Sequence, residues 1–175
     1  GHVAVIEKIN TDGSIITSSL NTYLNGTYLT SLGTLADKIA ITTWKVGGGN
    51  TTDVVPAAAY KNEVGSSASS TTVNKKIGLM YVSDYGFAAS QEAWTTKLSS
   101  YKSNTSKNWL FLGSPEWTIS RLSASSSTAF FVNSLGNVYG SKVTDSFGVR
   151  PSFNLESSVK YVSGSGSMSD PVRVN

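Results

Sequence analysis

The apolar residues of this chain follow two different spacings. Short runs of apolar and β-branched residues, typical of strands, recur from one end of the chain to the other. They predict strands over residues 3–9, 38–46, 76–83, 108–112, 117–121, 128–133, 138–144, 148–155 and 172–174. Leu20, Tyr23 and Leu24 instead repeat at helical spacing behind serines that can cap a helix, which predicts a helix from residue 18 towards 32. Residues 94–101 show a similar spacing and predict a short second helix.

One long segment interrupts this pattern. Residues 50–74 carry little periodicity, and residues 66–72 consist only of Ser, Ala and Thr, so we expect a mobile loop there. Strand patterns resume directly after it, which argues against a domain boundary. A length of 175 residues suits one domain. The sequence therefore predicts a single α+β domain over 1–175, made mainly of antiparallel strands with two or so helices.

The composition removes several kinds of chemistry. There is no cysteine, which excludes disulfides, cysteine-bound metals and a thiol nucleophile. The single histidine is His2, and Gly1-His2 is typical of the remnant of a cleaved tag. Aspartates are scattered and no cluster of oxygen ligands stands out, so we expect neither a metal nor another cofactor.

Charge and hydropathy argue against two kinds of partner, nucleic acids and membranes. The formal net charge is +3, and Lys75-Lys76 is the one basic doublet, so we expect no nucleic acid as partner. No apolar run approaches the roughly 18 residues that a membrane helix needs. We therefore expect no direct insertion into a membrane.

Two enzymatic hypotheses need only the residues present. A glycosidase works with two carboxylates, and Glu116 is the best candidate acid, with Asp84 or Asp145 as its partner. Ser-x-x-Lys occurs at 99–102 and 157–160, without the supporting tripeptides of serine–lysine enzymes. The sequence thus favours a protein that is not an enzyme, with a carbohydrate hydrolase as the weaker alternative.

Several segments, in order, resemble a family of uncharacterised bacterial domains with a C-type-lectin-like fold, common in Gram-positive and gut-associated species. The segments are 20–25, 44–48, 78–86, 109–113, 116–121, 136–138, 148–151 and 164–171. Within such folds, Gly148-Val149-Arg150 resembles the closing strand of formylglycine-generating enzymes and of retroelement-diversified binding proteins. The enzyme activity requires cysteine, which this chain lacks. The resemblance to the binding proteins implies a variable receptor-binding face over residues 122–147.

The resemblance also implies which residues in and next to the segment 122–147 vary and which stay constant. It implies that the varied positions are Thr128, Phe131, Asn133, Leu135, Tyr139, Ser141, Thr144, Asp145 and Phe147. It implies that the constant positions are Phe130, Val132, Gly136, Val138, Val143 and Arg150.

Strand alternation gives a physical reason for the same face. A strand over 128–133 puts Phe130 and Val132 on one side and Phe131 on the other, and Tyr139 follows Phe131 in the next strand. Rigid aromatic rings among Ser, Asn and Gly are typical of adaptable binding surfaces. The alternative is that these rings pack beneath a neighbouring loop or subunit.

We expect Phe131, Tyr139 and Phe147 to be the anchors of this surface. The full set of expected ligand-binding residues is Leu122, Thr128, Phe131, Asn133, Leu135, Asn137, Tyr139, Ser141, Asp145 and Phe147. Trp117, Arg121 and Arg150 border apolar runs, which favours structural roles, with carbonyl or carboxylate partners for the two guanidinium groups.

The resulting functional hypothesis is an extracellular ligand-binding module on a bacterial cell surface or a phage particle. Its partner would be a protein or glycan receptor on another cell or phage host. The alternative outside catalysis is a pilin-like or surface-layer subunit, in which strand 3–9 continues from an anchoring helix.

Overall fold

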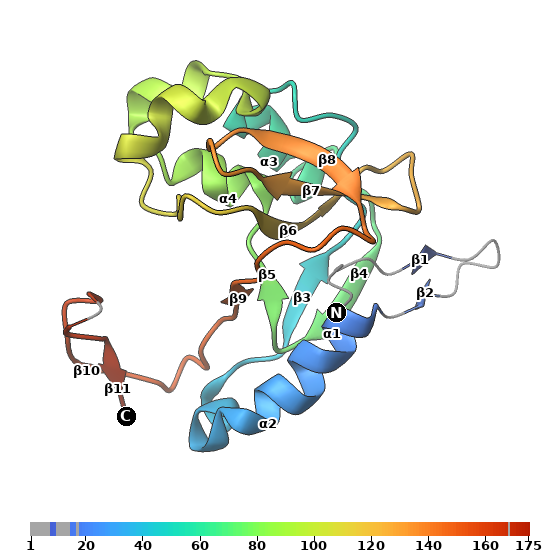
Figure 1. Ribbon diagram of the computed structural model, residues 1–175. Coiled ribbons are helices and arrows are strands. Elements are labelled where there is room, and N and C mark those ends of the chain that lie inside the picture. Colours follow the sequence, from blue (N-terminus) through green and yellow to red (C-terminus); the bar gives the residue numbers. More distant parts are fainter. Residues whose placement is uncertain (1–7, 10–14, 17, 168) are drawn as a thin grey trace.

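The computed structural model describes residues 8–9, 15–16, 18–167 and 169–175, in which helices alternate with five small antiparallel sheets (Figure 1). The α+β class predicted from the sequence is confirmed at this level. The first sheet pairs β1 (Lys8–Ile9) with β2 (Ile15–Ile16). The rest of the strand predicted over 3–9 lies outside the described residues.

The N-terminal helical segment confirms the predicted helix. It runs through α1 (Ser19–Tyr23), a π-helical turn η1 (Leu24–Tyr28) and α2 (Leu29–Ser31), and is followed by the 3₁₀ helix η2 (Gly33–Lys38). The Ser18 side chain accepts a hydrogen bond from the Asn21 N–H at 3.1 Å, which caps the first turn. Leu20 and Leu24 are buried and fix the helix to the core.

The segment expected to be a mobile loop contains regular structure instead. It holds α3 (Pro56–Glu63) and β4 (Thr72–Lys75), and β4 pairs antiparallel with β3 (Thr42–Lys45). Pro56 occupies the start of α3, where its missing N–H costs nothing. The loop prediction was wrong because the buried residues of α3 are Pro56, Ala59 and Glu63, which form no apolar stripe in the sequence.

Three further predictions fail in the middle of the chain. The strand expected over 76–83 is only β5 (Gly78–Leu79), because α4 (Val82–Phe87) begins where Asp84 accepts the Tyr81 N–H at 2.8 Å. The helix expected over 94–101 is replaced by two 3₁₀ helices, η3 (Gln91–Thr95) and η4 (Leu98–Lys107). No strand forms over 108–112, which turns across the surface.

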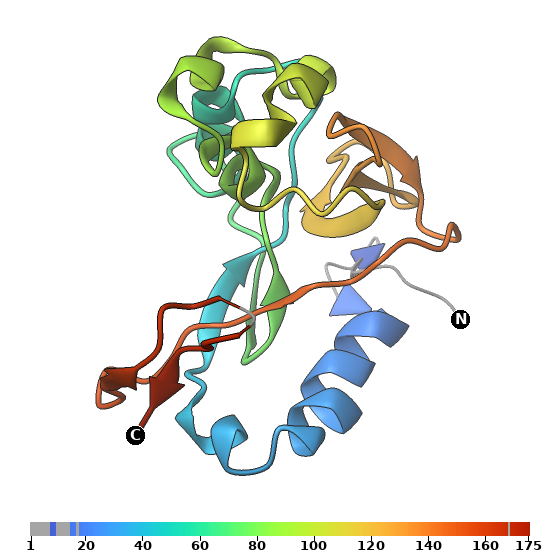
Figure 2. The same ribbon diagram turned by 60° about the vertical axis from the view of Figure 1, so that its left-hand side comes forward.

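The predicted hairpin is present in the three-stranded sheet of β6 (Glu116–Arg121), β7 (Thr128–Val132) and β8 (Val138–Lys142). The strand expected over 148–155 is reduced to β9 (Pro151–Ser152), which pairs with β5. The chain ends in a hairpin of β10 (Tyr161–Ser163), which the sequence did not predict, and β11 (Arg173–Val174), which it did. In both views this hairpin stands far from the β6–β8 sheet (Figures 1 and 2).

The β6–β8 sheet lies between two apolar clusters. Phe130, Val132 and Val138 face the first cluster, together with residues of α3, α4 and η4. Trp117 and Ala129 face the second, together with Leu20 and Leu24 of the N-terminal helical segment. The sheet is therefore buried on both faces over most of its area, and its β8 edge is the part that reaches solvent.

Candidate functional site

The hairpin alternates as predicted on its core side. Phe130, Val132 and Val138 are 4%, 1% and 0% exposed. On the other side, Trp117, Phe131 and Tyr139 are direct cross-strand partners and form a row across β6, β7 and β8. The row runs from buried Trp117, through half-buried Phe131, to Tyr139, which is 42% exposed.

The three expected anchors are not equally accessible. Phe131 and Phe147 stack on each other with ring centroids 4.3 Å apart, and the Phe147 ring lies 4.7 Å from the buried Trp117. Both phenylalanines pack against the second apolar cluster and present only part of their rings. Of the three anchors, Tyr139 is the one largely open to solvent.

The polar residues of the segment hold the hairpin in shape. The Asn133 side chain accepts the N–H groups of Leu135 and Asn137, each at 3.0 Å, which closes the turn. Ser141 donates to the Asp145 carboxylate. Asn137 is only 7% exposed, so its expected role as an exposed contact is corrected. Its amide oxygen accepts the Lys102 N–H at 2.8 Å and its amide nitrogen donates to the Tyr139 hydroxyl at 3.3 Å.

The remaining residues expected to bind a ligand differ in how exposed they are. Leu135, at the turn, is 61% exposed. Thr128 is half-buried and accepts from Ser125, while Leu122 packs against the first cluster. We use the name hairpin surface for Leu135 and Tyr139 together with the accessible edges of Phe131 and Phe147.

Both arginines have the partners expected of partly buried guanidinium groups. Arg150 donates to Glu116 and to the Leu110 carbonyl, each at 2.7 Å. Arg121 donates to carbonyl oxygens of Val46 and Ser125, at 3.2 and 3.1 Å, and burial lowers its pKa. These contacts tie separate segments of the chain to the β6 strand.

Glu116, the carboxyl favoured for an enzymatic acid, lies inside this network. It is 2% exposed and its burial raises its pKa, which the adjacent Arg150 guanidinium opposes. An ion-paired and buried carboxylate is not open to a substrate in this conformation. Asp145 is engaged with Ser141, and Asp84 lines a separate groove described below.

The sequence did not reveal a second buried carboxyl, that of Glu63. It is 4% exposed and accepts the N–H groups of Val82 and Ser83, at 3.1 and 3.0 Å, and the hydroxyl of Ser120. Burial raises its pKa, and these hydrogen bonds oppose that rise. Glu63 thus joins α3, α4 and β6, and its place in a segment read as a loop gave no signal of this role.

The sequence also missed an open groove beside α4. Seven residues line a volume of about 390 Å³: Met80, Asp84, Phe87, Ala88, Trp109, Leu110 and Ser152. We call it the Trp109 groove, because Trp109 is 77% exposed along it. A neighbouring groove of about 420 Å³ shares Asp84 and Ser152 with it. The signal was the run Trp109–Leu112, which is apolar without alternation and therefore fits a half-buried strand poorly.

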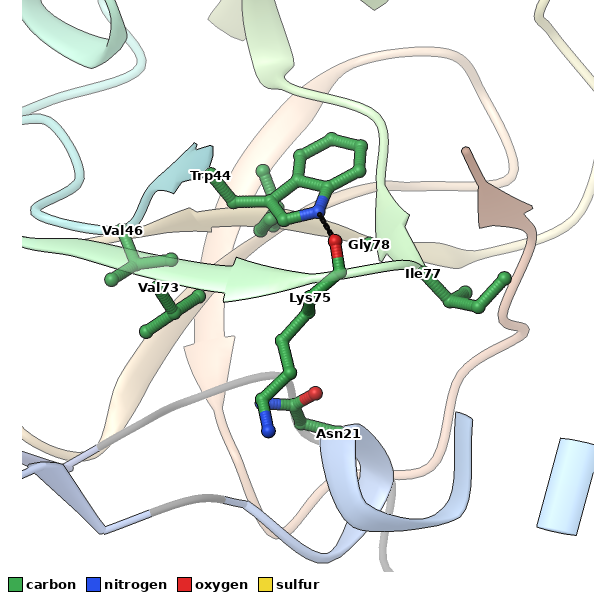
Figure 3. Close-up of a pocket in the computed structure, with 8 residues that line it drawn as sticks. Asn21, Trp44, Val46, Val73, Lys75, Ile77 and Gly78 are labelled. Atoms are coloured by element: carbon green, nitrogen blue, oxygen red, sulfur yellow. Dashed lines mark hydrogen bonds between the residues drawn. The ribbon is translucent and has the colours of Figure 1, made fainter. Parts of the chain in front are cut away.

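A third cavity is too small for a ligand. It has a volume of about 20 Å³ and lies between β4, β3 and the N-terminal helix (Figure 3). Trp44 donates to the Lys75 carbonyl at 3.0 Å on one wall, and the Lys75 side chain extends towards Asn21 (Figure 3). Such a volume holds about one water molecule.

The glycine run at 47–49 is explained by packing. Gly48 has φ +75°, and a Cβ there would lie 2.1 Å from the Arg121 carbonyl oxygen. The Gly49 N–H donates to that same oxygen at 2.9 Å. This segment approaches the end of β6 closely, which is why it contains glycine.

Fold and surfaces together define an α+β domain with a central antiparallel sheet, an exposed hairpin edge and an aromatic groove. The chain belongs to the family described as domain of unknown function DUF6273, which matches residues 7–157. No curated protein and no solved structure matches it. The β10–β11 hairpin lies beyond the matched range.

Neither a membrane-spanning helix nor a cluster of metal ligands is found among the described residues. None of the helices formed by these residues is long and apolar enough to cross a membrane. Within the same residues, no three His, Cys, Asp or Glu side chains gather where they would hold a metal ion.

Proposed function

We propose that this chain is a non-enzymatic ligand-binding module that recognises a protein or glycan receptor through the hairpin surface. The observation that carries the proposal is the exposure of Tyr139 at the open end of a row anchored by buried Trp117. We place the module outside a bacterial cell or on a phage particle, as the sequence resemblance implies.

The surroundings of Tyr139 favour binding. Its hydroxyl is held by Asn137, which is fixed in turn by the Lys102 N–H, and its strand is backed by the Phe131–Phe147 stack. An aromatic ring that is already oriented loses little conformational entropy when it binds. A few desolvated aromatic anchors carry most of the affinity in protein interfaces.

The pattern of burial supports a diversified face on a C-type-lectin-like fold, which is part of this proposal. Of the positions expected to be constant, Phe130, Val132 and Val138 are buried. Gly136 has φ +89°, and a Cβ there would lie 2.1 Å from Thr105, so only glycine fits. The positions expected to vary include the exposed Leu135 and Tyr139. Variation at such positions would change the surface without disturbing the core.

The β10–β11 hairpin favours a second candidate, a structural subunit of a pilin or surface layer. Tyr161, Val162 and Val172 are 66%, 60% and 55% exposed on it. A two-stranded hairpin is marginally stable by itself, and its edges offer unpaired backbone groups to another subunit. A Tyr161→Ser, Val162→Ser variant that still assembles like the wild type in analytical ultracentrifugation would remove this candidate.

Tyr139→Ala tests the ligand-binding proposal. Binding of the labelled chain to a glycan array and to a panel of intact bacterial cells identifies a target, and the variant is then titrated against that target. We expect at least about tenfold weaker binding, the loss of one anchor side chain. The control is Tyr60→Ala, since Tyr60 is 51% exposed on α3. Equal losses for the two variants, or a melting temperature that falls together with binding, would refute the proposal.

A further inference from the structure

We propose that the Trp109 groove is a binding site for an organic ammonium cation, separate from the hairpin surface. The site combines an exposed indole ring, an apolar wall and one carboxylate without a basic partner. The groove would bind such a cation whether or not the hairpin surface binds a receptor.

Hydrogen bonds hold the chain on which the exposed Trp109 ring of the site lies. Asn108 is buried; its side chain donates to the Tyr85 carbonyl at 2.9 Å and accepts the Leu110 N–H at 3.0 Å. These bonds hold the chain on both sides of Trp109, which is nevertheless 77% exposed. Phe87, on the groove wall, is held edge-on against Trp94 with ring centroids 5.1 Å apart. A large indole surface is thus kept in solvent on a rigid support.

The charge of the groove comes from Asp84. One of its carboxylate oxygens accepts the Tyr81 N–H, and no described residue donates to the other oxygen. The ion pairs among the described residues are Lys97–Asp53, Arg150–Glu116 and Arg173–Asp170, so Asp84 belongs to none of them. The Asp84 side chain is exposed, and the protein packed beside it raises the pKa of its carboxyl by partial desolvation.

Neighbouring cations do not neutralise this charge. Arg150 contacts two residues of the groove lining, Met80 and the Leu110 carbonyl, but its guanidinium is paired with Glu116. Lys45 lines the adjoining groove and donates to the Val64 carbonyl at 3.0 Å. Among the described residues, no arginine or lysine therefore pairs with the Asp84 carboxylate in the Trp109 groove.

This combination selects one class of ligand. A cation over an indole face is attracted by the π-electrons, and a carboxylate beside it adds direct ionic attraction. A neutral apolar ligand would leave Asp84 further desolvated and unpaired. A sugar needs several polar partners, whereas the polar side-chain groups that line this groove are those of Asp84 and Ser152 and the indole N–H of Trp109. A cation carried on an apolar group satisfies both the rings and the acid.

Two sources supply this chemistry: a small quaternary ammonium compound, and the lysine side chain of a peptide. Titration of the whole chain with choline and with Nα-acetyl-lysine methyl ester, followed by tryptophan fluorescence and calorimetry, distinguishes them. The neutral isostere of choline, 3,3-dimethylbutan-1-ol, has the same shape without the charge. We expect one of the two cations to bind at least about tenfold tighter than this alcohol.

Variants link this binding to the groove. Trp109→Ala should abolish it, whereas Leu112→Ala, at a residue 58% exposed in the same segment, should leave it unchanged. Asp84→Asn keeps an oxygen for the Tyr81 N–H but removes the charge, and should weaken binding about fivefold or more. Asp37→Asn is the matched control for loss of an exposed acid, and Tyr139→Ala should have no effect.

Four results would overturn the proposal. They are absence of binding by both cations, equal binding of the neutral alcohol, an unchanged affinity in Asp84→Asn, and displacement of the cation by cellobiose or maltose at equal concentration. The last would indicate a saccharide site. Because Tyr139 does not line the Trp109 groove, failure here leaves the proposal for the hairpin surface to be judged by its own experiment.

Discussion

Replacing Glu63 by alanine tests the packing at the junction of α3, α4 and β6. The Ser83 N–H and the Ser120 hydroxyl would lose their carboxylate partner, while the Val82 N–H would lose the carboxylate but keep the Ser120 hydroxyl oxygen at 3.2 Å. A buried donor without a partner costs about 1–3 kcal/mol. Removal of a desolvated charge returns part of that cost, so we expect the free energy of unfolding to fall by about 2–5 kcal/mol.

Urea unfolding followed by tryptophan fluorescence measures this change. Glu156→Ala is the control, because Glu156 is exposed and should shift the free energy of unfolding by no more than about 0.5 kcal/mol. A loss below about 1 kcal/mol in Glu63→Ala would show that water or relaxation replaces the carboxylate, and would refute this reasoning.

The carboxyl of Glu63 should also make the free energy of unfolding depend on pH. Burial raises the pKa of Glu63 above its ordinary value of 4.5, so the folded chain binds this proton more tightly than the unfolded chain does. Glu63 therefore adds stability as the pH falls from neutral through its folded pKa towards 4.5. Glu63→Gln lacks this titration. The free energy of unfolding of the wild type minus that of the variant should rise over this interval, and a constant difference would contradict the assignment.

Two further predictions concern the β6 network and the glycines. Gly48→Ala should lower the free energy of unfolding by at least about 2 kcal/mol, because Gly48 has a positive φ and a Cβ there would meet the Arg121 carbonyl. Gly26→Ala is the control. Because Gly26 lies on the helix with open space around it, this change should raise the free energy of unfolding by about 0.5–1 kcal/mol. Equal effects in chemical denaturation would count against the turn geometry at Gly48 being the cause. Arg150→Ala should cost about 3–5 kcal/mol at neutral pH because it leaves the Glu116 carboxylate buried and unpaired, and less in acid, where that carboxylate is protonated. Arg173→Ala, at an exposed pair, should cost under about 1 kcal/mol, and a comparable loss in both arginine variants would be the contrary result.

Local patterns in the sequence predicted the parts of the fold that depend on local spacing. The N-terminal helix has an apolar stripe and a capping serine, and the β7–β8 hairpin has alternation on both sides of a glycine turn. The α3 helix has no such stripe, and the strand expected at 76–83 stops early because Asp84 caps a helix there. Spacing alone could not distinguish these outcomes.

The candidate sites depend on contacts between distant residues. Glu63 and Ser120 are 57 positions apart, and Arg150 and Glu116 are 34 apart, so neither pair is visible as a motif. The Trp109 groove joins side chains from α4, the segment after η4 and β9. Trp109 lies in a segment expected to be a strand, because an apolar run gives no sign of which of its residues face solvent.

Hydrogen–deuterium exchange on the complex tests the central claim most directly. The whole chain, bound to the receptor identified on cells or on the glycan array, is compared with the free chain, peptide by peptide. We predict that protection appears over 133–147, which contains the turn, Tyr139 and Phe147. Protection confined to other segments, such as 108–112 or 161–174, with 133–147 unchanged, would contradict the claim that the hairpin surface binds the receptor.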